Sequence, residues 1–303
     1  MTGTTRYSEP DAPSTEFQIS FRDGDDVTQA DRQNAERSVA ALVARSKEAA
    51  ARDRAAEAGL AELTDPLNAP FKKLIEEDPH AVKALEELRT HELLQPETTD
   101  ALPQDAPSTT HDASPLAESG FAPPYDFEWS FHIDNPPFSQ SLNRFTGQID
   151  LDARSGAIDG GASGRAIAHA GFGVWMAFEG PGRKFPHAVL NPGEFKFVLA
   201  TAGFGSNATS EGGFALSVFE DGRFLTGTSN KMWRRRISGT EAATGGMGPQ
   251  IVTAPDFEFN LRSGHAYSVN AGIWVVTDRS PGVGVAAAQS VMSARLTRMW
   301  LIS

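Results

Sequence analysis

The chain has 303 residues, of which 40% are hydrophobic and 22% are charged, and its formal net charge is -12. This composition is typical of a globular protein. The acidic balance argues against nonspecific binding to DNA, RNA or anionic membranes, because these partners require clustered positive charge. The chain contains no cysteine, which excludes disulfides, thiolate catalysis and cysteine-ligated metals.

Charged and aromatic residues divide the chain into two regions. Residues 1–120 contain 24 acidic and 12 basic residues, whereas residues 121–303 contain 15 of each. All five tryptophans follow residue 120. We therefore expect two regions that pack in different ways.

Targeting signals are not evident in the sequence. The first residues lack a basic segment followed by an apolar run, and no apolar run approaches the ~20 residues of a membrane helix. We therefore expect no membrane insertion and, by default, a cytoplasmic location. Export without a signal peptide stays open.

The N-terminal region is expected to be an arm followed by helices. Residues 1–26 are polar and predict a flexible arm. Residues 27–94 are rich in strong helix formers and predict an α-helical region. Its first helix should begin at Thr28, which forms a capping-box pattern with Asp31, and reach about Leu63. The apolar stripe of this helix is narrow, so it should pack against another helix, another subunit or the β domain.

Two Asp-Pro pairs predict further helices. The pairs are Asp65-Pro66 and Asp78-Pro79, and each places a capping acid before a proline at the first helical position. We expect helices near residues 66–77 and 79–94. Residues 95–124 then contain six prolines among small polar residues, which predicts a linker.

A two-residue periodicity begins after the linker. In residues 127–134, apolar and polar side chains alternate strictly, which is typical of a half-buried strand. About eight to ten such segments follow, separated by turns rich in Gly, Pro and Asp and not by helices. Because parallel strands need crossover connections, we expect antiparallel pairing. Residues 125–303 are therefore predicted to form an antiparallel β-sandwich or jelly roll.

One spacing could supply metal ligands. His132 and Asp134 lie two apart on a predicted strand, so both side chains point to the same side. A zinc site would need a further ligand such as His169, His187 or His265. We favour the alternative, a solvated face that holds a histidine, and we expect no cofactor.

Two tryptophans are candidates for binding a glycan. Most tryptophans lie in apolar strands and predict core positions, whereas Trp175 and Trp233 are less determined. Exposed aromatic faces stack on sugar rings, and β-sandwiches commonly serve as lectins. A tryptophan in a strand is nevertheless more often buried than exposed.

The stretch KMWRRRIS, residues 231–238, concentrates positive charge. Strand alternation places Arg234 and Arg236 on one side, as an exposed pair that could bind a partner. It places Arg235 beside Trp233, where Arg235 needs a carboxylate or a ring. Acidic residues of the helical region could bind the exposed pair, from the same or a neighbouring subunit; they are Glu76, Glu77, Asp78, Glu86 and Glu87.

Three functions are compatible with these features. The first is a non-enzymatic structural or assembly protein, in which the β-sandwich joins a homo-oligomer or a larger particle through the acidic helical arm. The second is a carbohydrate-binding, lectin-like module, with a glycan as its partner. The third is a sandwich enzyme that hydrolyses glycans or esters with paired carboxylates. We rank them in this order, because no catalytic motif of the G-x-S-x-G, P-loop or H-E-x-x-H type occurs.

Overall fold

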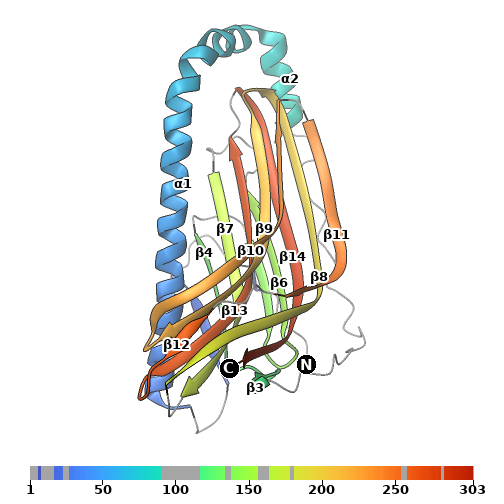
Figure 1. Cartoon of the computed structure of the whole chain (residues 1–303). Coiled ribbons are helices and arrows are strands. Elements are labelled where there is room, and N and C mark those ends of the chain that lie inside the picture. Colours follow the sequence, from blue (N-terminus) through green and yellow to red (C-terminus); the bar gives the residue numbers. More distant parts are fainter. Residues whose placement is uncertain are drawn as a thin grey trace.

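A computed structural model describes residues 6–7, 17–22, 27–89, 117–133, 138–155, 164–177, 181–239, 241–253, 258–280 and 283–302. Within these residues the strands form two antiparallel sheets, and a long helix runs along the outside of one of them (Figure 1). The predicted mainly β fold, an antiparallel sandwich preceded by an α-helical region, is confirmed. No helix in these ranges combines the length and the apolar composition of a membrane span.

Sheet A has eight strands. They are β1 (Arg6–Tyr7), β5 (Phe138–Asn143), β6 (Gln148–Ser155), β14 (Val283–Ile302), β8 (Gly182–Phe204), β11 (Glu241–Thr253), β3 (Ala117–Phe121) and β12 (Phe259–Leu261). The strand order is β1-β5-β6-β14-β8-β11, while β3 pairs with β14 and β12 pairs with β8. The long strands β8 and β14 pair along nearly their whole length and form the centre of the sheet.

Sheet B has six strands and faces sheet A. They are β10 (Arg223–Ser238), β9 (Asn207–Glu220), β13 (Ala266–Ser280), β7 (Gly164–Ala177), β4 (Phe127–Ile133) and β2 (Gln18–Phe21), in this spatial order. The strand β10 is therefore at one edge of the sheet, and β2 is at the other.

Three segments differ from their expected roles. Residues 6–7, predicted to belong to a flexible arm, pair with β5. Residues 18–21, predicted to belong to a flexible arm, pair with β4 in the register Gln18 to Ser130, because Ile19 and Phe21 find apolar neighbours there. Residues 117–121, predicted to belong to the linker, pair with β14. Residues 95–116 of the predicted linker lie outside the described residues, and the division into domains stays a prediction.

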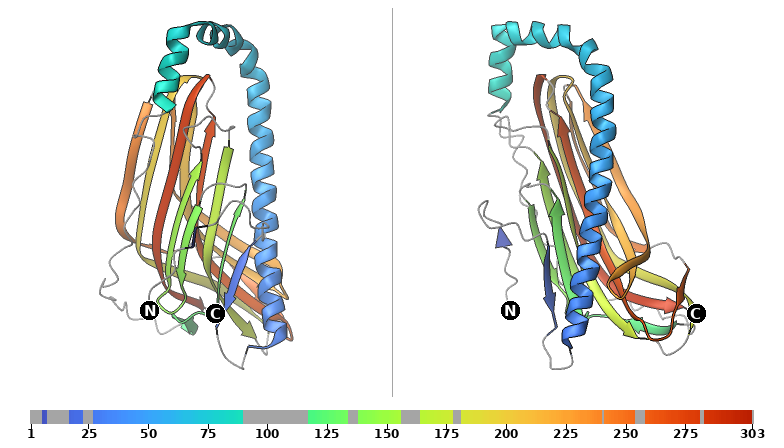
Figure 2. Two further views of the ribbon diagram at one scale, coloured as in Figure 1. Left: turned by 180° about the vertical axis from the view of Figure 1, so that it is seen from behind. Right: turned by 90° about the vertical axis from the view of Figure 1, so that its left-hand side faces the viewer.

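Helix α1 (Gln29–Glu77) begins where the sequence predicts. The Thr28 side chain accepts a hydrogen bond from the Asp31 amide at 3.1 Å, and the Asp31 carboxylate accepts one from the Thr28 amide at 3.0 Å. The predicted new start at Asp65 is wrong, because α1 continues through Pro66 and Pro70. A proline inside a helix removes one hydrogen bond and favours a bend without necessarily ending the helix. The helix indeed turns across the top of the sandwich (Figures 1 and 2).

Helix α2 (Pro79–Arg89) confirms the second predicted start. Asp78 adopts an extended backbone conformation, and its side chain accepts a hydrogen bond from the His80 amide at 2.9 Å. This bond satisfies one of the amides that have no partner within a helix. The two Asp-Pro pairs therefore differ in backbone conformation, although they look alike in the sequence.

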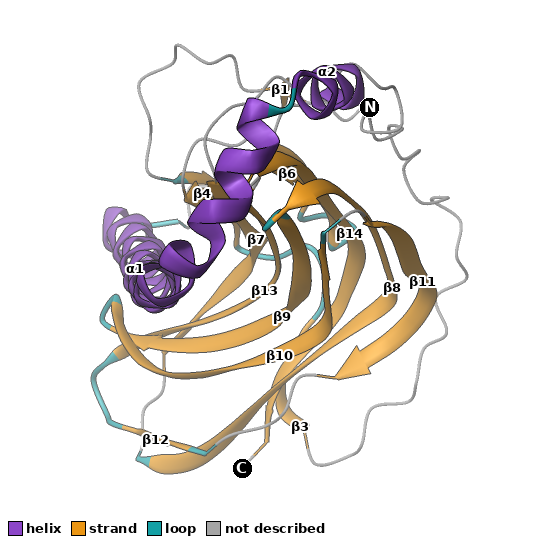
Figure 3. Cartoon of the chain, turned by 90° about the horizontal axis from the view of Figure 1, so that it is seen from above, coloured by secondary structure: helices purple, strands orange, loops and turns teal. Residues whose placement is uncertain are grey.

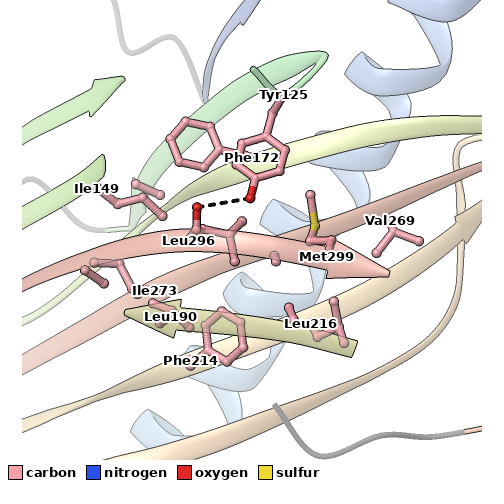
Figure 4. Packing of buried hydrophobic residues seen from close by; sticks show 14 of the residues in the cluster. Tyr125, Ile149, Phe172, Leu190, Phe214, Leu216, Val269, Ile273, Leu296 and Met299 are labelled. Carbon is pink, nitrogen blue, oxygen red and sulfur yellow. Dashed lines mark hydrogen bonds between the residues drawn. The ribbon is translucent and has the colours of Figure 1, made fainter. Parts of the chain in front are cut away.

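The main core fills the space between the two sheets. Tyr125 lies at one side of it, stacks on Phe172 with 5.1 Å between ring centroids, and donates a hydrogen bond to the Leu296 carbonyl at 3.0 Å (Figure 4). Burial raises the pKa of the Tyr125 hydroxyl, which stays protonated and can donate this bond. Alternating side chains of the central strands supply most of the remaining core.

A third layer covers the outer face of sheet B. Residues of α1 pack there against the outward aromatic residues of β4; the helix residues are Ala35, Val39, Val43 and Ala50. Ser38 is hydrogen-bonded to Ser268 beneath the helix, with 3.0 Å between the hydroxyl oxygens. The view from above shows α1 beside sheet B, opposite sheet A (Figure 3). The narrow apolar stripe of the helix thus packs on the β domain, one of the three expected surfaces.

Aromatic rings lie against glycines of neighbouring strands at several positions. A β-carbon added to Gly173 would lie 2.0 Å from the Phe127 ring, and one added to Gly212 would lie 1.9 Å from the Trp233 ring. The registered pairs are Phe127 with Gly173, Trp129 with Gly171, Trp233 with Gly212, Trp274 with Gly213 and Phe197 with Gly245. Each glycine therefore provides the space that a ring occupies.

Candidate interaction surface

The last third of α1 forms, with α2, an arch over one end of the sandwich (Figures 1 and 2). The packed part of α1 ends near Asp53, which forms an ion pair with Arg165 of β7 at 2.7 Å. Beyond this point the described side chains of the helix are almost all exposed. At the other end of the arch, α2 approaches β8 and β14. The arch thus begins and ends beside the sandwich.

Large apolar side chains are exposed on the arch. The exposed fractions are 74% for Leu63, 73% for Leu67, 52% for Phe71 and 65% for Leu74. At 3.6 residues per turn these four residues fall within an arc of about 80°. We call these four residues the arch stripe. Exposed apolar side chains gathered on one surface commonly mark an interaction site.

Four charged residues of the arch lie away from the stripe on a straight helical projection. The helical period places Glu62, Asp65, Lys73 and Glu76 more than about 100° from its centre. Lys73 is 3.7 Å from Glu77 in an exposed pair four residues apart, and Lys83 is 3.7 Å from Glu87 in the next helix. Such pairs stabilise a helix by only a few tenths of a kcal/mol, about 0.3–0.5. The arch is therefore amphipathic, and its apolar side is exposed.

The basic residues of β10 lie on the edge strand of sheet B. Lys231 and Arg234 both bind the Glu211 carboxylate of β9, at 2.5 Å and 2.9 Å. Arg234 therefore has a partner in its own sheet, whereas binding of Arg234 and Arg236 to acids of a helical arm stays a prediction. Charged side chains on an edge strand also discourage pairing with another chain.

The neighbouring arginines differ in their contacts. Arg235 finds the carboxylate expected for it in Glu241 at 3.2 Å, and its side chain stays half exposed although Trp233 and Ile237 are buried. Arg236 is exposed. The charged stretch is thus divided among separate contacts and does not form one site for three arginines.

Both candidate tryptophans lie in apolar layers. Trp233 is only 8% exposed, stacks on Phe195 with 4.3 Å between centroids, and donates a hydrogen bond from Nε1 to Ser210 at 2.9 Å. Trp175 is half-buried and stacks on Phe21 with 6.1 Å between centroids. A neighbouring ring therefore stacks on one face of each tryptophan, and binding of a glycan there stays a prediction.

The candidate metal ligands that fall in the described ranges do not lie together. His132 is half-buried, and burial lowers its pKa, while Asp134 lies outside the described residues. His169 is on the other side of sheet B, stacked on Phe131 with 4.5 Å between centroids, and His187 stacks on Trp300 of sheet A. No group of three acidic or histidine side chains that could hold a metal occurs in the described ranges.

A polar cluster that the sequence reasoning missed joins the β9–β10 turn to the start of β13. Tyr267 donates a hydrogen bond to Glu220 at 2.7 Å, and Arg262 binds both carboxylate oxygens of Glu220. His265 lies 2.6 Å from Asp221, whose φ is 51°. The only sequence signal is the turn Glu-Asp-Gly, because the partners are 42 to 47 residues away.

These contacts determine the protonation of the cluster. The hydrogen bond from Arg262 lowers the pKa of Glu220, and the contact with His265 lowers the pKa of Asp221. Burial raises the pKa of Tyr267. Both carboxylates are therefore ionised at neutral pH and are already engaged within the cluster, which favours a role in fixing the turn.

No protein-family model matches this sequence. No curated protein matches it at a significant level.

Proposed function

We propose that this chain is a non-enzymatic assembly protein that joins an oligomer or a larger particle through its helical arch. The single observation that supports this proposal is the exposure of Leu63, Leu67, Phe71 and Leu74 on one side of the arch. Burial of a leucine or phenylalanine side chain stabilises a protein by about 1.5–3 kcal/mol. In an isolated chain these side chains stay in water and contribute little of this stabilisation. A bound partner would bury them.

The folded state of the arch supports the same role. The helix packs on the sandwich before Asp53, and α2 lies near β8 and β14, so the stripe belongs to an ordered helix. Ordering a binding surface in advance reduces the entropy that is lost on association. An apolar stripe on a folded helix would therefore bind better than the same residues in an unstructured tail.

The basic edge strand is a proposed second contact. Arg236 is exposed and Arg234 is engaged with Glu211, so Arg236 is the better candidate for binding acids of another subunit. Exposed ion pairs contribute about 0–1 kcal/mol. A contact through Arg236 would therefore orient a bound subunit more than it would strengthen its binding. The glycan-binding and hydrolytic alternatives have no comparable support, since the rings of Trp175 and Trp233 already have stacking partners.

The proposal is tested in the cells that naturally make this chain. The native mass of the full-length chain in a fresh extract is compared with that of a variant carrying Leu63→Gln, Leu67→Gln and Leu74→Gln. We expect the unmodified chain in an assembly larger than a monomer and the variant as a monomer. The matched control carries Glu62→Gln, Asp65→Asn and Glu76→Gln, and it should assemble normally. An unmodified chain that migrates as a monomer would overturn the proposal.

A further inference from the structure

We propose that Ser238 is a phosphorylation site, at which a serine kinase that recognises arginine adds a phosphoryl group from a nucleoside triphosphate. This modification goes beyond the proposed assembly function and does not depend on it. Three observations point to Ser238: the arginines that precede it, the exposure of these residues, and its position at the end of an edge strand.

Arginine is concentrated immediately before Ser238. Three of the four preceding residues are Arg234, Arg235 and Arg236, and no other serine of the sequence has more than one arginine among its four preceding residues. A guanidinium binds a carboxylate through two parallel hydrogen bonds. A kinase whose substrate groove carries carboxylates would therefore select Ser238 among the serines of this chain.

The acceptor and its arginines are accessible on the folded chain. Arg236 and Ser238 are exposed. The side chain of Arg234 is 59% exposed in its contact with Glu211, and that of Arg235 is 49% exposed in its contact with Glu241. Ion pairs as exposed as these contribute little to stability, so carboxylates of an enzyme can replace Glu211 and Glu241 at little cost.

Ser238 is the last residue of the edge strand β10. It pairs with Asn207 of β9, and β10 has no second neighbour in the described part of sheet B. Gly239 follows with a φ of 74°, which glycine adopts without strain, and begins the turn away from the strand. Residues 234–238 are thus already extended, the conformation in which a peptide lies in a recognition groove. The end of an edge strand is also where a sheet opens most easily.

The transfer needs one co-reactant, a nucleoside triphosphate with its Mg²⁺. The Ser238 Oγ attacks the γ-phosphorus, and the bond from this phosphorus to the oxygen that bridges to the β-phosphate breaks. The hydroxyl proton passes to a carboxylate of the kinase, and a nucleoside diphosphate leaves. The product is a phosphoserine with a charge of about -1.5 to -2 at neutral pH.

The added phosphate would have a partner on its own strand. Strand alternation places Ser238 and Arg236 on the same side of β10, roughly 6–7 Å apart along the chain. A phosphate at Ser238 would bind the exposed guanidinium of Arg236 through charge-assisted hydrogen bonds. Phosphorylation would therefore compete with acids of another subunit for Arg236, a consequence that rests on the proposed assembly function.

The first test examines the full-length chain isolated, with phosphatase inhibitors, from the cells that naturally make it. Tandem mass spectrometry should locate a phosphate at Ser238. The variant with Arg235→Gln and Arg236→Gln should carry at least about tenfold less phosphate there, because two charge-assisted contacts with the kinase are lost. The matched control is Arg223→Gln, an exposed position at the other end of β10, and its phosphate content should be unchanged.

The second test uses purified full-length chain, Mg²⁺, ATP and one arginine-directed enzyme, the catalytic subunit of cyclic-AMP-dependent protein kinase. We expect one phosphate at Ser238, none at this position in Ser238→Ala, and slower addition by at least about tenfold in the variant with Arg235→Gln and Arg236→Gln. Circular dichroism of each variant confirms that it is folded, so that a lost phosphate reports on recognition.

The outcomes are decided by the natural chain. A natural chain without phosphate at Ser238 would overturn the proposal, even where the purified kinase adds one. Equal phosphate in the natural chain and in the variant with Arg235→Gln and Arg236→Gln would overturn recognition through arginine. Neither result touches the arch stripe, so the assembly function would still stand or fall on the arch variants alone.

Discussion

The two parts of helix α1 differ in how they use their apolar residues. Up to Asp53 the helix packs on sheet B through small side chains such as Ala35, Val39 and Val43, all of which are buried. Beyond Asp53 its apolar residues are larger, yet Leu63 and Leu67 are about three-quarters exposed. Within one helix, the packed part uses mostly small residues together with Leu42, whereas the large residues of the last third are exposed.

The space above sheet B explains why the packed part of α1 has mostly small side chains. The outer face of sheet B already carries large rings of β4, including Trp129 and Phe131, so a helix must approach them with small residues to achieve close packing. The arch has no sheet beneath its stripe, and leucine there is not limited by space. A large apolar residue on a helix is therefore no sign, by itself, that the helix is buried in its own chain.

The largest expected effect on stability comes from introducing an aspartate into each of the two parts of α1. Val39→Asp should lower the free energy of unfolding by about 3–5 kcal/mol, because it buries a charge without a partner. Leu67→Asp should change it by less than about 0.5 kcal/mol, as expected for an exposed position. Urea unfolding of the two variants, followed by tryptophan fluorescence, measures both values. Equal losses would contradict the division of the helix into two parts.

Glycine-to-alanine substitutions should change stability in opposite directions in the sandwich and in the exposed part of α1. Gly212→Ala places a β-carbon against the Trp233 ring and should destabilise the protein by about 1–3 kcal/mol. Gly59→Ala meets no atom within 4 Å and should stabilise α1 by about 0.5–1 kcal/mol, since alanine is the better helix former. Thermal melting of both variants checks the opposite signs. A stabilising Gly212→Ala would show that the ring has room to move.

The third effect is a pH dependence of stability that originates at His169 in sheet B. Burial lowers the pKa of His169 to about 3, whereas an unfolded histidine has a pKa near 6.5. Below pH 6.5 the unfolded chain binds a proton that the folded chain does not, so stability falls as the pH falls from about 6.5 towards 3. Between pH 7 and 5 the loss should be about 2 kcal/mol. His169→Gln removes this contribution, and urea titrations across the range should show a shallower slope for the variant.

The smallest effect tests where the packed part of α1 ends. Asp53→Asn removes the carboxylate that binds Arg165, whose side chain is only 14% exposed, and should cost about 1 kcal/mol. The matched substitution Asp65→Asn, on the arch, should be neutral within about 0.5 kcal/mol. Chemical unfolding of both variants at low and high salt measures the change in the free energy of unfolding. If both substitutions were neutral, the packed part of the helix would end before Asp53.

Local patterns were sufficient to predict most of the fold. The alternation around Phe127 and Trp129 identified β4, and the Thr28–Asp31 pattern located the start of α1. Pro66 was misread as a helix start, because the same Asp-Pro pair can begin a helix or bend one. The strand β2 was missed because four residues carry little periodicity of their own.

The candidate site was harder to predict for a similar reason. The leucines of the helical region are visible in the sequence, but their exposure depends on where the sandwich ends beneath the helix. The partner of Arg234, Glu211, lies on the adjacent strand and is known only once the register is known. The position of Trp233 likewise depends on Gly212, a residue that no local pattern connects to it.

The consecutive glycines of β9 have a consequence for strand pairing. Gly212 receives Trp233 of β10 on the side of sheet A, and Gly213 receives Trp274 of β13 on the side of α1. A shift of either neighbouring strand by one residue would move a ring from its glycine and present it with the wrong face of β9. The register of β9 with β10 and β13 is therefore fixed by the fit of the two rings against the two glycines. This fit disfavours slipped strand pairing while the sheet forms.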